Sequence, residues 1–280
     1  MTIRRLPKAA ERGKKWTMLT AYDAPTAEIL ESEGVDLILV GDSVGMVLLG
    51  YDSTREVTMD EMIHHAKAVR RGAPKSFIIG DMPLKGIEKG PAQALRSAKR
   101  FIREAGCDAV KVEWGKNSIE ITDLLVHHRI PVMGHVGLTP QNPKIGFKVQ
   151  GQTAGSAIEI FETAKMFEKH KVFSLLLECL PSPVARAITE HVKVPVIGIG
   201  AGPDCDGQVL VYHDLVGAFK KFHPRFVKNY ADIDKSMRNA VRKYIRDVRE
   251  KNFPKKMHSF SMKKNELLDF KRVLGTRKNG

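Results

Sequence analysis

Hydrophobic residues along the chain gather in short apolar runs, and each run is followed by a turn and a longer segment of helical periodicity. The sequences LILV, FII and SLLL show the pattern most clearly. Continuous apolar runs of this length are typical of parallel strands that are buried on both faces. Eight such runs predict strands at residues 17–20, 37–41, 77–80, 109–113, 132–136, 174–179, 196–200 and 208–212.

Segments of helical period lie between most of these runs and predict the helices that connect parallel strands. They fall around residues 25–33, 59–71, 91–105, 117–128, 156–170 and 182–191. Eight strand–helix units favour an α/β fold, a (β/α)8 TIM barrel, over the alternative of a doubly wound open sheet. No Pro-, Gly- or Ser-rich linker divides the chain, so we expect one barrel domain over residues 1–280, in which residues 228–280 form a basic C-terminal helical extension and tail.

The net charge of +14 arises mainly at the C-terminal end of the 280 residues. Residues 228–280 contain 16 Lys and Arg against 6 Asp and Glu, which is ten of the fourteen net positive charges. Within residues 228–251, apolar residues recur at helical spacing and predict a basic amphipathic helix with an apolar stripe against the barrel. The stripe consists of Met237, Val241, Ile245 and Val248. Most charge runs of this kind are solvated helix faces, so we expect a nearly neutral barrel and no nucleic-acid partner.

The cysteines and the N-terminal residues indicate the compartment. Cys107, Cys179 and Cys205 are widely spaced and form no Cys-x-x-Cys pair, so the sequence indicates neither a disulfide framework nor a zinc ribbon. The basic N-terminus lacks the apolar segment of a signal peptide, and no stretch approaches 18 uncharged apolar residues. We therefore expect a cytoplasmic protein that does not bind or cross a membrane.

Four of the predicted strands end in an acidic residue. These acids are Asp42, which Ser43 follows, and Asp81, Glu113 and Glu178. A barrel directs the carboxyl ends of its strands to one mouth, where barrel enzymes carry their reacting groups. A single acid at this position often caps the next helix, whereas four carboxylates together repel each other unless they share a cation or a proton. All-oxygen ligands without clustered Cys or His favour Mg²⁺, which takes only one or two carboxylates directly.

Two further polar residues are expected to face the mouth. Lys111 lies two residues before Glu113 and therefore points the same way, with Val110 and Val112 on the opposite face. Lys111 could be a structural ion-pair partner of Glu113, a Schiff-base lysine or a clamp for a substrate carboxylate; the clamp is favoured because a metal makes an imine unnecessary. His135 follows the same logic at the end of the fifth strand, where it would orient a carboxylate or bond a substrate oxygen.

The glycine-rich sequence VIGIGAG on the seventh strand indicates a nucleotide only weakly. Gly198, Gly200 and Gly202 do not match G-x-G-x-x-G, and no G-x-x-x-x-G-K-[ST] occurs in the chain. Close backbone packing, or the approach of a flat ligand to the chain, is at least as good an interpretation.

Ten blocks of sequence form one further pattern over about residues 14–260, in order and without large gaps. They read TAYD, LVGDSVGM, HAKAVRRGAP, GDMP, AVKVE, GHVGLTPQ, KVQG, LLLECLP, VPVIGIGAG and DGQVLVYHDLVG. Together these blocks resemble the ketopantoate hydroxymethyltransferase family, also called the 3-methyl-2-oxobutanoate hydroxymethyltransferases.

The resemblance implies a (β/α)8 barrel that uses Mg²⁺ and transfers a one-carbon unit from 5,10-methylenetetrahydrofolate to 3-methyl-2-oxobutanoate. The products are 2-dehydropantoate (ketopantoate) and tetrahydrofolate, on the route to pantothenate and coenzyme A. The implied partners are thus a small 2-oxo acid and a folate. Family members form large homo-oligomers, often decamers, so the resemblance also implies a homo-oligomer.

Carried onto this sequence, the family's residues define a predicted site. Asp42 and Asp81 are the implied metal ligands, with Glu113 beside them as a ligand or through water. Glu178 is the implied general base. The implied substrate-binding residues are Asp42, Ser43, Asp81, Lys111 and His135.

The sequence departs from the family pattern at two places that concern the folate side. The loop TPQNPKIGFKVQG is shorter than is usual in the family, and Trp114 stands where a glycine often follows the strand-four acid. Residues 261–280 continue beyond the family core, and the resemblance implies nothing about them.

The alternative function is that of another Mg-dependent 2-oxo acid carbon–carbon lyase or mutase, of the isocitrate lyase and phosphoenolpyruvate mutase group. Lyases of that group resemble one another in a Cys-Gly-His loop. Here Met133 precedes Gly134 and His135, and the missing cysteine counts against this alternative.

Overall fold

The computed structural model describes residues 15–142 and 148–276. Residues 1–14, on which the expectation about a signal peptide falls, and the centre of the loop TPQNPKIGFKVQG lie outside the described residues. The chain divides into two compact units, Met1–Ala231 and Asp232–Gly280. None of the helices in the described part combines the length and the apolar composition that a membrane-spanning segment needs.

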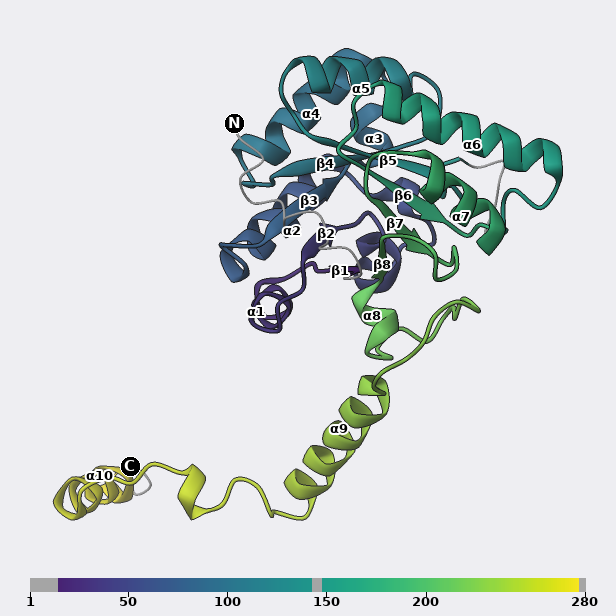
Figure 1. Cartoon of the computed structure of the whole chain (residues 1–280). Coiled ribbons are helices and arrows are strands. Elements are labelled where there is room, and N and C mark those ends of the chain that lie inside the picture. Colours follow the sequence, from purple (N-terminus) through teal and green to yellow (C-terminus); the bar gives the residue numbers. More distant parts are fainter. Residues whose placement is uncertain (1–14, 143–147, 277–280) are drawn as a thin grey trace. The chain divides into compact units, whose positions relative to one another are not determined.

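Eight parallel strands form a closed barrel in the first unit (Figure 1). They are β1 (Trp16–Thr20), β2 (Leu37–Val40), β3 (Phe77–Asp81), β4 (Ala109–Glu113), β5 (Val132–Gly137), β6 (Ser174–Glu178), β7 (Val196–Ile199) and β8 (Gly207–Leu210). Each strand pairs with the next, and β8 pairs with β1, with Gly207 opposite Trp16. The predicted (β/α)8 TIM barrel is confirmed, and the doubly wound open sheet is wrong because β1 and β8 close the ring.

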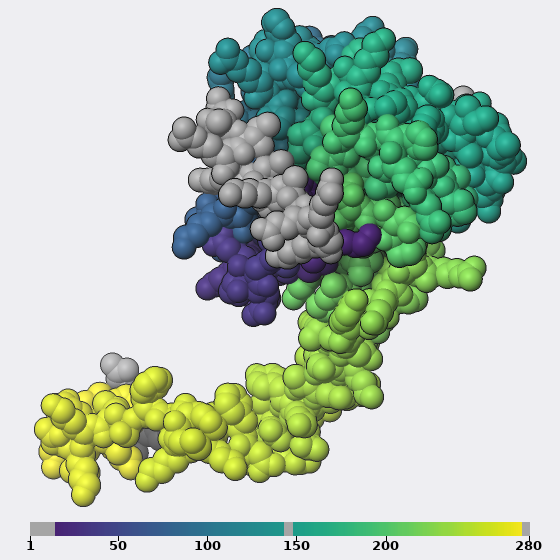
Figure 2. Space-filling view, in the orientation of Figure 1, coloured from purple at the N-terminus to yellow at the C-terminus, as the bar shows by residue number. Residues whose placement is uncertain are grey.

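Helices surround this barrel, and all six predicted helical segments are present. These six are α1 (Ala24–Ser32), α2 (Met59–Gly72), α4 (Pro91–Arg103), α5 (Ser118–His127), α6 (Ala154–Lys169) and α7 (Ser182–His191). Shorter elements lie between strands and helices: the π-helix η1 (Gly45–Leu49), the 3₁₀-helix η2 (Thr54–Glu56), α3 (Leu84–Ile87) and α8 (Tyr212–Leu215). In the space-filling view, the teal and green part of the chain, which includes α4 to α7, makes up much of the visible surface of this unit (Figure 2).

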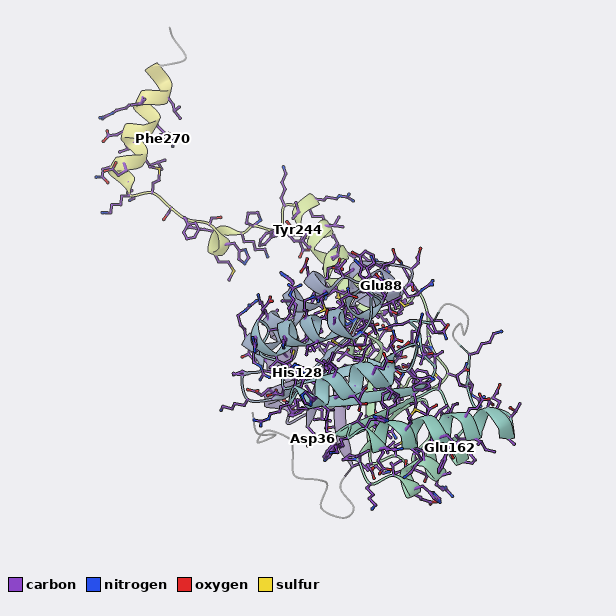
Figure 3. All side chains as sticks on the ribbon, turned by 90° about the horizontal axis from the view of Figure 1, so that it is seen from above. Asp36, Glu88, His128, Glu162, Tyr244 and Phe270 are labelled. Atoms are coloured by element: carbon purple, nitrogen blue, oxygen red, sulfur yellow. The ribbon has the colours of Figure 1, made fainter. Side chains whose placement is uncertain are left out.

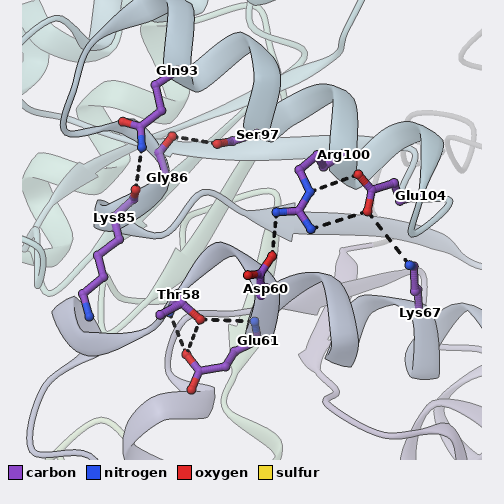
Figure 4. Close-up of polar contacts among 10 residues, drawn as sticks. All are labelled: Thr58, Asp60, Glu61, Lys67, Lys85, Gly86, Gln93, Ser97, Arg100 and Glu104. Atoms are coloured by element: carbon purple, nitrogen blue, oxygen red, sulfur yellow. Dashed lines mark hydrogen bonds and ion pairs between the residues drawn. The ribbon is translucent and has the colours of Figure 1, made fainter.

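A capping residue determines where α2 begins, and an arginine forms an ion pair between α2 and α4. Thr58 caps α2 through a capping box: its hydroxyl accepts from the Glu61 amide, while the Glu61 carboxylate accepts from the Thr58 amide at 2.7 Å (Figure 4). Arg100 of α4 reaches Asp60 of α2 at 2.7 Å and Glu104 at 3.0 Å (Figure 4). Because Asp60 is largely exposed, these pairs contribute little to stability, and packing of the apolar helix faces does most.

The strand pleat divides the core of this unit into two layers. Residues such as Ile38 and Val110 point outward and pack under the helices, whereas Leu37, Leu39 and Ala109 belong to a separate cluster inside the barrel. Successive side chains of a strand point to opposite faces, so the inward positions continue upward along each strand. The apolar layers end near the carboxyl ends of the strands, where the inward positions become polar.

The glycines of VIGIGAG are explained by close packing. A Cβ atom on Gly198 would lie 2.7 Å from Cys205 Sγ, and one on Gly200 would lie 2.6 Å from the Phe226 ring. Gly200 also has a φ of +61°, in the left-handed region that side chains other than glycine rarely adopt. The packing interpretation of this motif is therefore confirmed.

The second unit contains α9 (Ile233–Arg249), the 3₁₀-helix η3 (Lys256–His258) and α10 (Lys264–Thr276). The side chain of Asp232 caps α9 by accepting from the Lys235 amide. The basic amphipathic helix predicted within residues 228–251 is thus present. Its apolar side chains are exposed; Tyr244 on α9 and Phe270 on α10, both labelled in Figure 3, are 60% and 51% exposed.

Candidate functional site

The carboxyl ends of the strands meet at a cavity of about 290 Å³ in the mouth of the barrel. The inward side chain at the end of β3, β4, β5 and β6 is polar in each case, because the pleat that places Ile79 in the core also places Asp81 two residues on above it. All seven residues predicted from the sequence line this cavity: Asp42, Ser43, Asp81, Lys111, Glu113, His135 and Glu178.

Asp42 and Asp81 form a buried pair of acids. They are 7% and 2% exposed, and the backbone amide of Asp42 donates a hydrogen bond to Asp81 Oδ2 at 3.1 Å. Burial, followed by the neighbouring Asp81 carboxylate, raises the pKa of Asp42 well above its ordinary value. Two carboxylates held together out of water are an arrangement that a bound cation relieves.

Lys111 supplies the positive charge nearest to this pair. Its Nζ lies 2.8 Å from Asp81 Oδ1 and 3.3 Å from His135 Nδ1, and the side chain is almost fully buried. Burial alone would lower the pKa of Lys111, but Asp81, Asp42 and Glu113 raise it above its ordinary value, so the ammonium stays charged. A permanently charged Lys111 suits the clamp interpretation and not the Schiff-base one, which needs a neutral amine.

Glu113 is held by a residue from the loop after β5. Its Oε1 accepts from the backbone amide of Gln141 at 2.9 Å, and the Gln141 side chain donates to Asp42 Oδ2 at 2.9 Å and to the Met82 carbonyl at 3.0 Å. Burial raises the pKa of Glu113, while Lys111 acts in the opposite direction. Gln141 therefore bridges two predicted metal-site acids from one buried position.

His135 lies between Lys111 and Glu178. Burial and then the Lys111 charge lower the pKa of His135, so its imidazole is neutral near pH 7. Lys111 can only donate, so Nδ1 accepts from it and the ring proton lies on Nε2, which faces Glu178 Oε2 at 3.2 Å without a well-aligned hydrogen bond. The Glu178 side chain is 20% exposed, against 2% for His135, so it is open to the cavity.

Ser43 reaches the cavity beside Asp42 and contacts a residue that follows β1. The Ser43 hydroxyl is 2.8 Å from the hydroxyl of the buried Tyr22. Burial raises the pKa of Tyr22, so its hydroxyl is protonated and can donate to Ser43. Ser43 Oγ is then free to donate its own proton to a ligand oxygen.

The acid pair fits a hard divalent cation. Among residues 15–142 and 148–276, no three His, Cys, Asp or Glu side chains make up a complete metal cage. Mg²⁺ does not need one, because it keeps several waters and takes one or two carboxylates. The buried oxygens of Asp42 and Asp81, with the raised pKa of Asp42, supply that donor set. Whether Glu113 binds such an ion directly stays a prediction.

Three residues in or next to the cavity were missed as functional candidates, although each lies in a sequence block that carries the family resemblance. Tyr22 is in TAYD, Gln141 ends GHVGLTPQ, and Asp214 is in DGQVLVYHDLVG. Tyr22 and Gln141 position predicted site residues, and Asp214 lines the cavity from α8. Tyr22 and Asp214 each lie two residues after the end of a predicted strand, so the strand-end signal could have found them. Gln141 lies five residues after a predicted strand, and the pattern does not mark it.

Comparison with known sequences identifies close relatives. The family model described as ketopantoate hydroxymethyltransferase matches residues 1–256. A 3-methyl-2-oxobutanoate hydroxymethyltransferase of Carboxydothermus hydrogenoformans is 47% identical over 264 residues, which cover 94% of this chain and 96% of the relative. The enzyme of the same name from Oleidesulfovibrio alaskensis is 49% identical over 261 residues, which cover 92% of this chain and 90% of that one.

Solved structures with the same fold are more distant in sequence. A crystal structure of 2,3-dimethylmalate lyase, a member of the PEP mutase/isocitrate lyase superfamily, aligns with a TM-score of 0.59 at 16% identity over 97% of this chain and 94% of that one. A phosphonopyruvate hydrolase in complex with oxalate and Mg²⁺ aligns with a TM-score of 0.60 at 13% identity over 98% and 96% of the two chains. These structures support the barrel fold alone.

Proposed function

The chain belongs to the ketopantoate hydroxymethyltransferase family. From this premise we propose how the residues at the mouth of the barrel transfer a hydroxymethyl group to 3-methyl-2-oxobutanoate. The reaction is a step of pantothenate biosynthesis. The proposed one-carbon donor is 5,10-methylenetetrahydrofolate, and the proposed cofactor is Mg²⁺. The sequence relatives favour this activity over that of the lyases and mutases, which share the fold at far lower identity.

The 2-oxo acid binds over the acid pair, with its carboxylate toward Lys111 and Ser43. Lys111 is charged and buried, and the Ser43 hydroxyl accepts a hydrogen bond from Tyr22, which leaves its own proton free. Both side chains can therefore donate a hydrogen bond to an anionic group. Asp42 and Asp81 hold Mg²⁺, which when bound supplies Lewis-acid stabilisation of negative charge at the keto oxygen. Gln141 keeps the Asp42 carboxylate in place through its hydrogen bond.

Glu178 removes the proton from C3 of the substrate. It is the most open of the mouth acids, since its side chain is 20% exposed while those of Asp81 and Glu113 are 3% and 4% exposed. Its neighbour His135 is neutral and presents Nε2 to the Glu178 carboxylate. The imidazole thereby orients the base without placing a second positive charge beside it.

The identity of the products requires that one carbon–carbon bond forms and that the bonds between the transferred carbon and the folate break. The electron pair left at C3 attacks the methylene carbon of the donor, a carbon–carbon bond forms, and the carbon–nitrogen bonds to the folate break. The folate nitrogens take up protons, and one water per turnover supplies the hydroxyl oxygen of ketopantoate. These reaction steps need no oxidant or reductant.

The observation that carries the proposal is the convergence of the seven predicted side chains on one cavity, within a chain of this family. Purified protein incubated with Mg²⁺, 3-methyl-2-oxobutanoate and 5,10-methylenetetrahydrofolate should form ketopantoate, and EDTA should abolish product until Mg²⁺ is restored. Absence of ketopantoate with both substrates and the metal present would reject the proposed activity. Turnover that EDTA leaves unchanged would reject the metal assignment alone.

The proposed assembly is a homo-oligomer in the cytoplasm. Exposed apolar side chains on α9, among them Met237 and Val241 at 61% and 57%, support self-association because such residues are normally covered in solution. Light scattering on the purified full chain tests the assembly, and a monomer at micromolar concentration would reject it.

A further inference from the structure

One wall of the cavity takes no part in the chemistry proposed above. It is formed by β8, by α8 and by the segment that follows them, and we call it the 209–226 wall. The cavity-lining residues of this wall are Val209, Val211, Asp214, Phe219, Phe222, Pro224, Arg225 and Phe226. Six of the eight are apolar and three of these are aromatic, which is the lining expected around a flat ring.

Asp214 is the acid of this wall, and its surroundings are unusual. Its side chain lines the cavity although the residue is only 9% exposed. The main chain of Asp214 is tied down, because its amide donates to the Val211 carbonyl and its own carbonyl accepts from the Asn229 side chain. No hydrogen bond or ion pair to its carboxylate occurs among the described residues. A buried carboxylate without a partner is costly, and such groups are retained mainly where a ligand completes them.

The charges around Asp214 decide which ligand suits it. Burial raises its pKa to about 6, against the weaker opposing effect of His223, so the carboxylate is ionised at neutral pH. Asp214 lines the same cavity as Asp42 and Asp81, so a ligand at Asp214 shares the mouth with a substrate held at those acids. A 2-oxo acid is itself an anion and would be repelled by Asp214. The group must therefore meet a different molecule, one that offers hydrogen-bond donors.

A folate has a matching edge. The aminopyrimidinone half of its pterin ring presents a ring N–H and an exocyclic NH₂ side by side, and a carboxylate accepts such a pair through both of its oxygens. We propose that the 209–226 wall is the donor subsite, in which the Asp214 carboxylate accepts hydrogen bonds from the aminopyrimidinone edge of the folate and the aromatic residues cover its ring. This inference rests on the proposed function, because that function supplies the folate donor.

The rim of the same cavity carries positive charge, which would attract the carboxylates of the folate's glutamate end. Lys148 and Arg225 both line the cavity, and both residues are exposed. The glutamate end of a folate bears carboxylates at the far end from the pterin. With the pterin at Asp214, two solvent-facing cations at the rim steer and hold this anionic end, as charges at the edge of a binding site commonly do.

The test separates donor binding from the chemistry on the 2-oxo acid. Asp214→Asn should raise KM for 5,10-methylenetetrahydrofolate by about ten- to hundredfold, the loss expected for a hydrogen bond to a charged group. Exchange of the C3 proton of 3-methyl-2-oxobutanoate with D₂O needs no folate, so it should stay within about twofold of the unchanged chain. The matched control is Asp52→Asn, an exposed acid after β2 that does not line the cavity, and it should alter neither quantity.

Direct titration with tetrahydrofolate gives a second readout that does not depend on turnover. Asp214→Asn and Phe222→Ala should each weaken binding of tetrahydrofolate measured by calorimetry, while Asp52→Asn should not. An unchanged donor KM in Asp214→Asn, or loss of C3 exchange together with donor binding, would overturn the inference. Failure of the proposed function looks different: the unchanged chain would then bind tetrahydrofolate through Asp214 but form no ketopantoate.

Discussion

At the scale of single residues, the five acids of the cavity differ in what surrounds them. Asp42, Asp81 and Glu113 are buried beside Lys111 or Gln141, Asp214 is buried alone, and Glu178 is partly exposed beside a neutral histidine. Different surroundings give chemically identical groups different tasks, since charge partners hold a carboxylate in place while an open position leaves it able to take a proton.

The first prediction concerns Glu178 as the base. Glu178→Gln keeps the shape of the side chain and removes its ability to accept a proton, so exchange of the C3 proton with D₂O should fall by about 10²- to 10⁴-fold. Binding of Mg²⁺ and of 3-methyl-2-oxobutanoate should change little. Exchange is followed by proton NMR, with the exposed Glu190→Gln as a control. Exchange that persists in Glu178→Gln would remove Glu178 as the base.

The second prediction concerns Gln141, which touches Asp42 and Glu113 without itself being an acid. Gln141→Ala removes the side-chain bond to Asp42 but leaves the backbone amide that Glu113 uses. Residues that orient metal ligands typically change metal affinity by about ten- to hundredfold when they are removed, so Mg²⁺ should bind more weakly by that factor. Mg²⁺ titration of turnover measures the effect, and saturating Mg²⁺ should restore most of the rate. A variant whose Mg²⁺ requirement is unchanged would show that Gln141 does not position the metal site.

The third prediction is a cost in stability at Asp214. Its pKa is raised from 3.8 to about 6 by burial, with His223 opposing and Tyr22 nearby. The folded chain thus holds the Asp214 proton more tightly than the unfolded chain. The free energy of unfolding therefore falls, through this group, as the pH rises from about 4 to 6, and it falls no further above that range. Asp214→Asn removes that loss and should stabilise the protein by about 1–3 kcal/mol above pH 6, and by nearly nothing at pH 4. Urea unfolding at several pH values measures it, and a variant that is less stable at pH 8 would contradict the expectation.

At the scale of elements, a contact between the carboxyl ends of β5 and β6 positions Glu178. Gly137 ends β5 with a φ of +102°, and a Cβ atom there would lie 2.3 Å from the Glu178 carbonyl oxygen at the end of β6. The amide of Leu138 also donates to that carbonyl at 2.9 Å. The glycine therefore allows β5 to turn away while the two strand ends stay in contact, which fixes the backbone that carries Glu178.

The fourth prediction follows from this contact. Gly137→Ala should destabilise the protein by about 1–3 kcal/mol, since alanine adds both strain at positive φ and a clash with backbone. It should also slow C3 exchange, because Glu178 would be displaced from the substrate. A matched change is Gly50→Ala, where φ is +82° but no atom lies within 4 Å of the added Cβ, so only the strain remains. Equal effects of the two substitutions on exchange would show that the Glu178 contact is irrelevant.

The elements that the sequence predicts well are those with a repeating physical cause. Most of the strands are buried on both faces and consist of continuous apolar runs. The pleat places Lys111 and Glu113 on one face and Val110 and Val112 on the other, as expected. Short elements such as η1 and α8 span too few residues for a period, so nothing in the pattern predicts them. Gln141 and Tyr22 act through tertiary contacts between segments far apart in the chain, and periodicity carries no information about such contacts.

At the scale of the whole molecule, charge and chemistry lie in different parts of the chain. The cavity is lined by residues between Thr20 and Phe226, and the family match ends at residue 256. Most of the net charge of +14 lies after residue 227. The strong basicity of the chain therefore describes its C-terminal part, while the proposed active site consists of a few acids, Lys111 and their polar neighbours in the barrel.

The last prediction is that residues 261–280 are dispensable for turnover. This stretch contains α10 and six Lys and Arg against two acids, and it lies beyond both the family match and the cavity. A chain that ends at Phe260 should keep kcat and both KM values within about twofold, since it retains every residue that lines the cavity. Steady-state kinetics at low and at physiological salt measures this, because a charge effect on anionic substrates would weaken with salt. If KM for either anionic substrate rises at low salt only, the tail attracts substrates; a loss of kcat would instead mean that the extension supports the barrel.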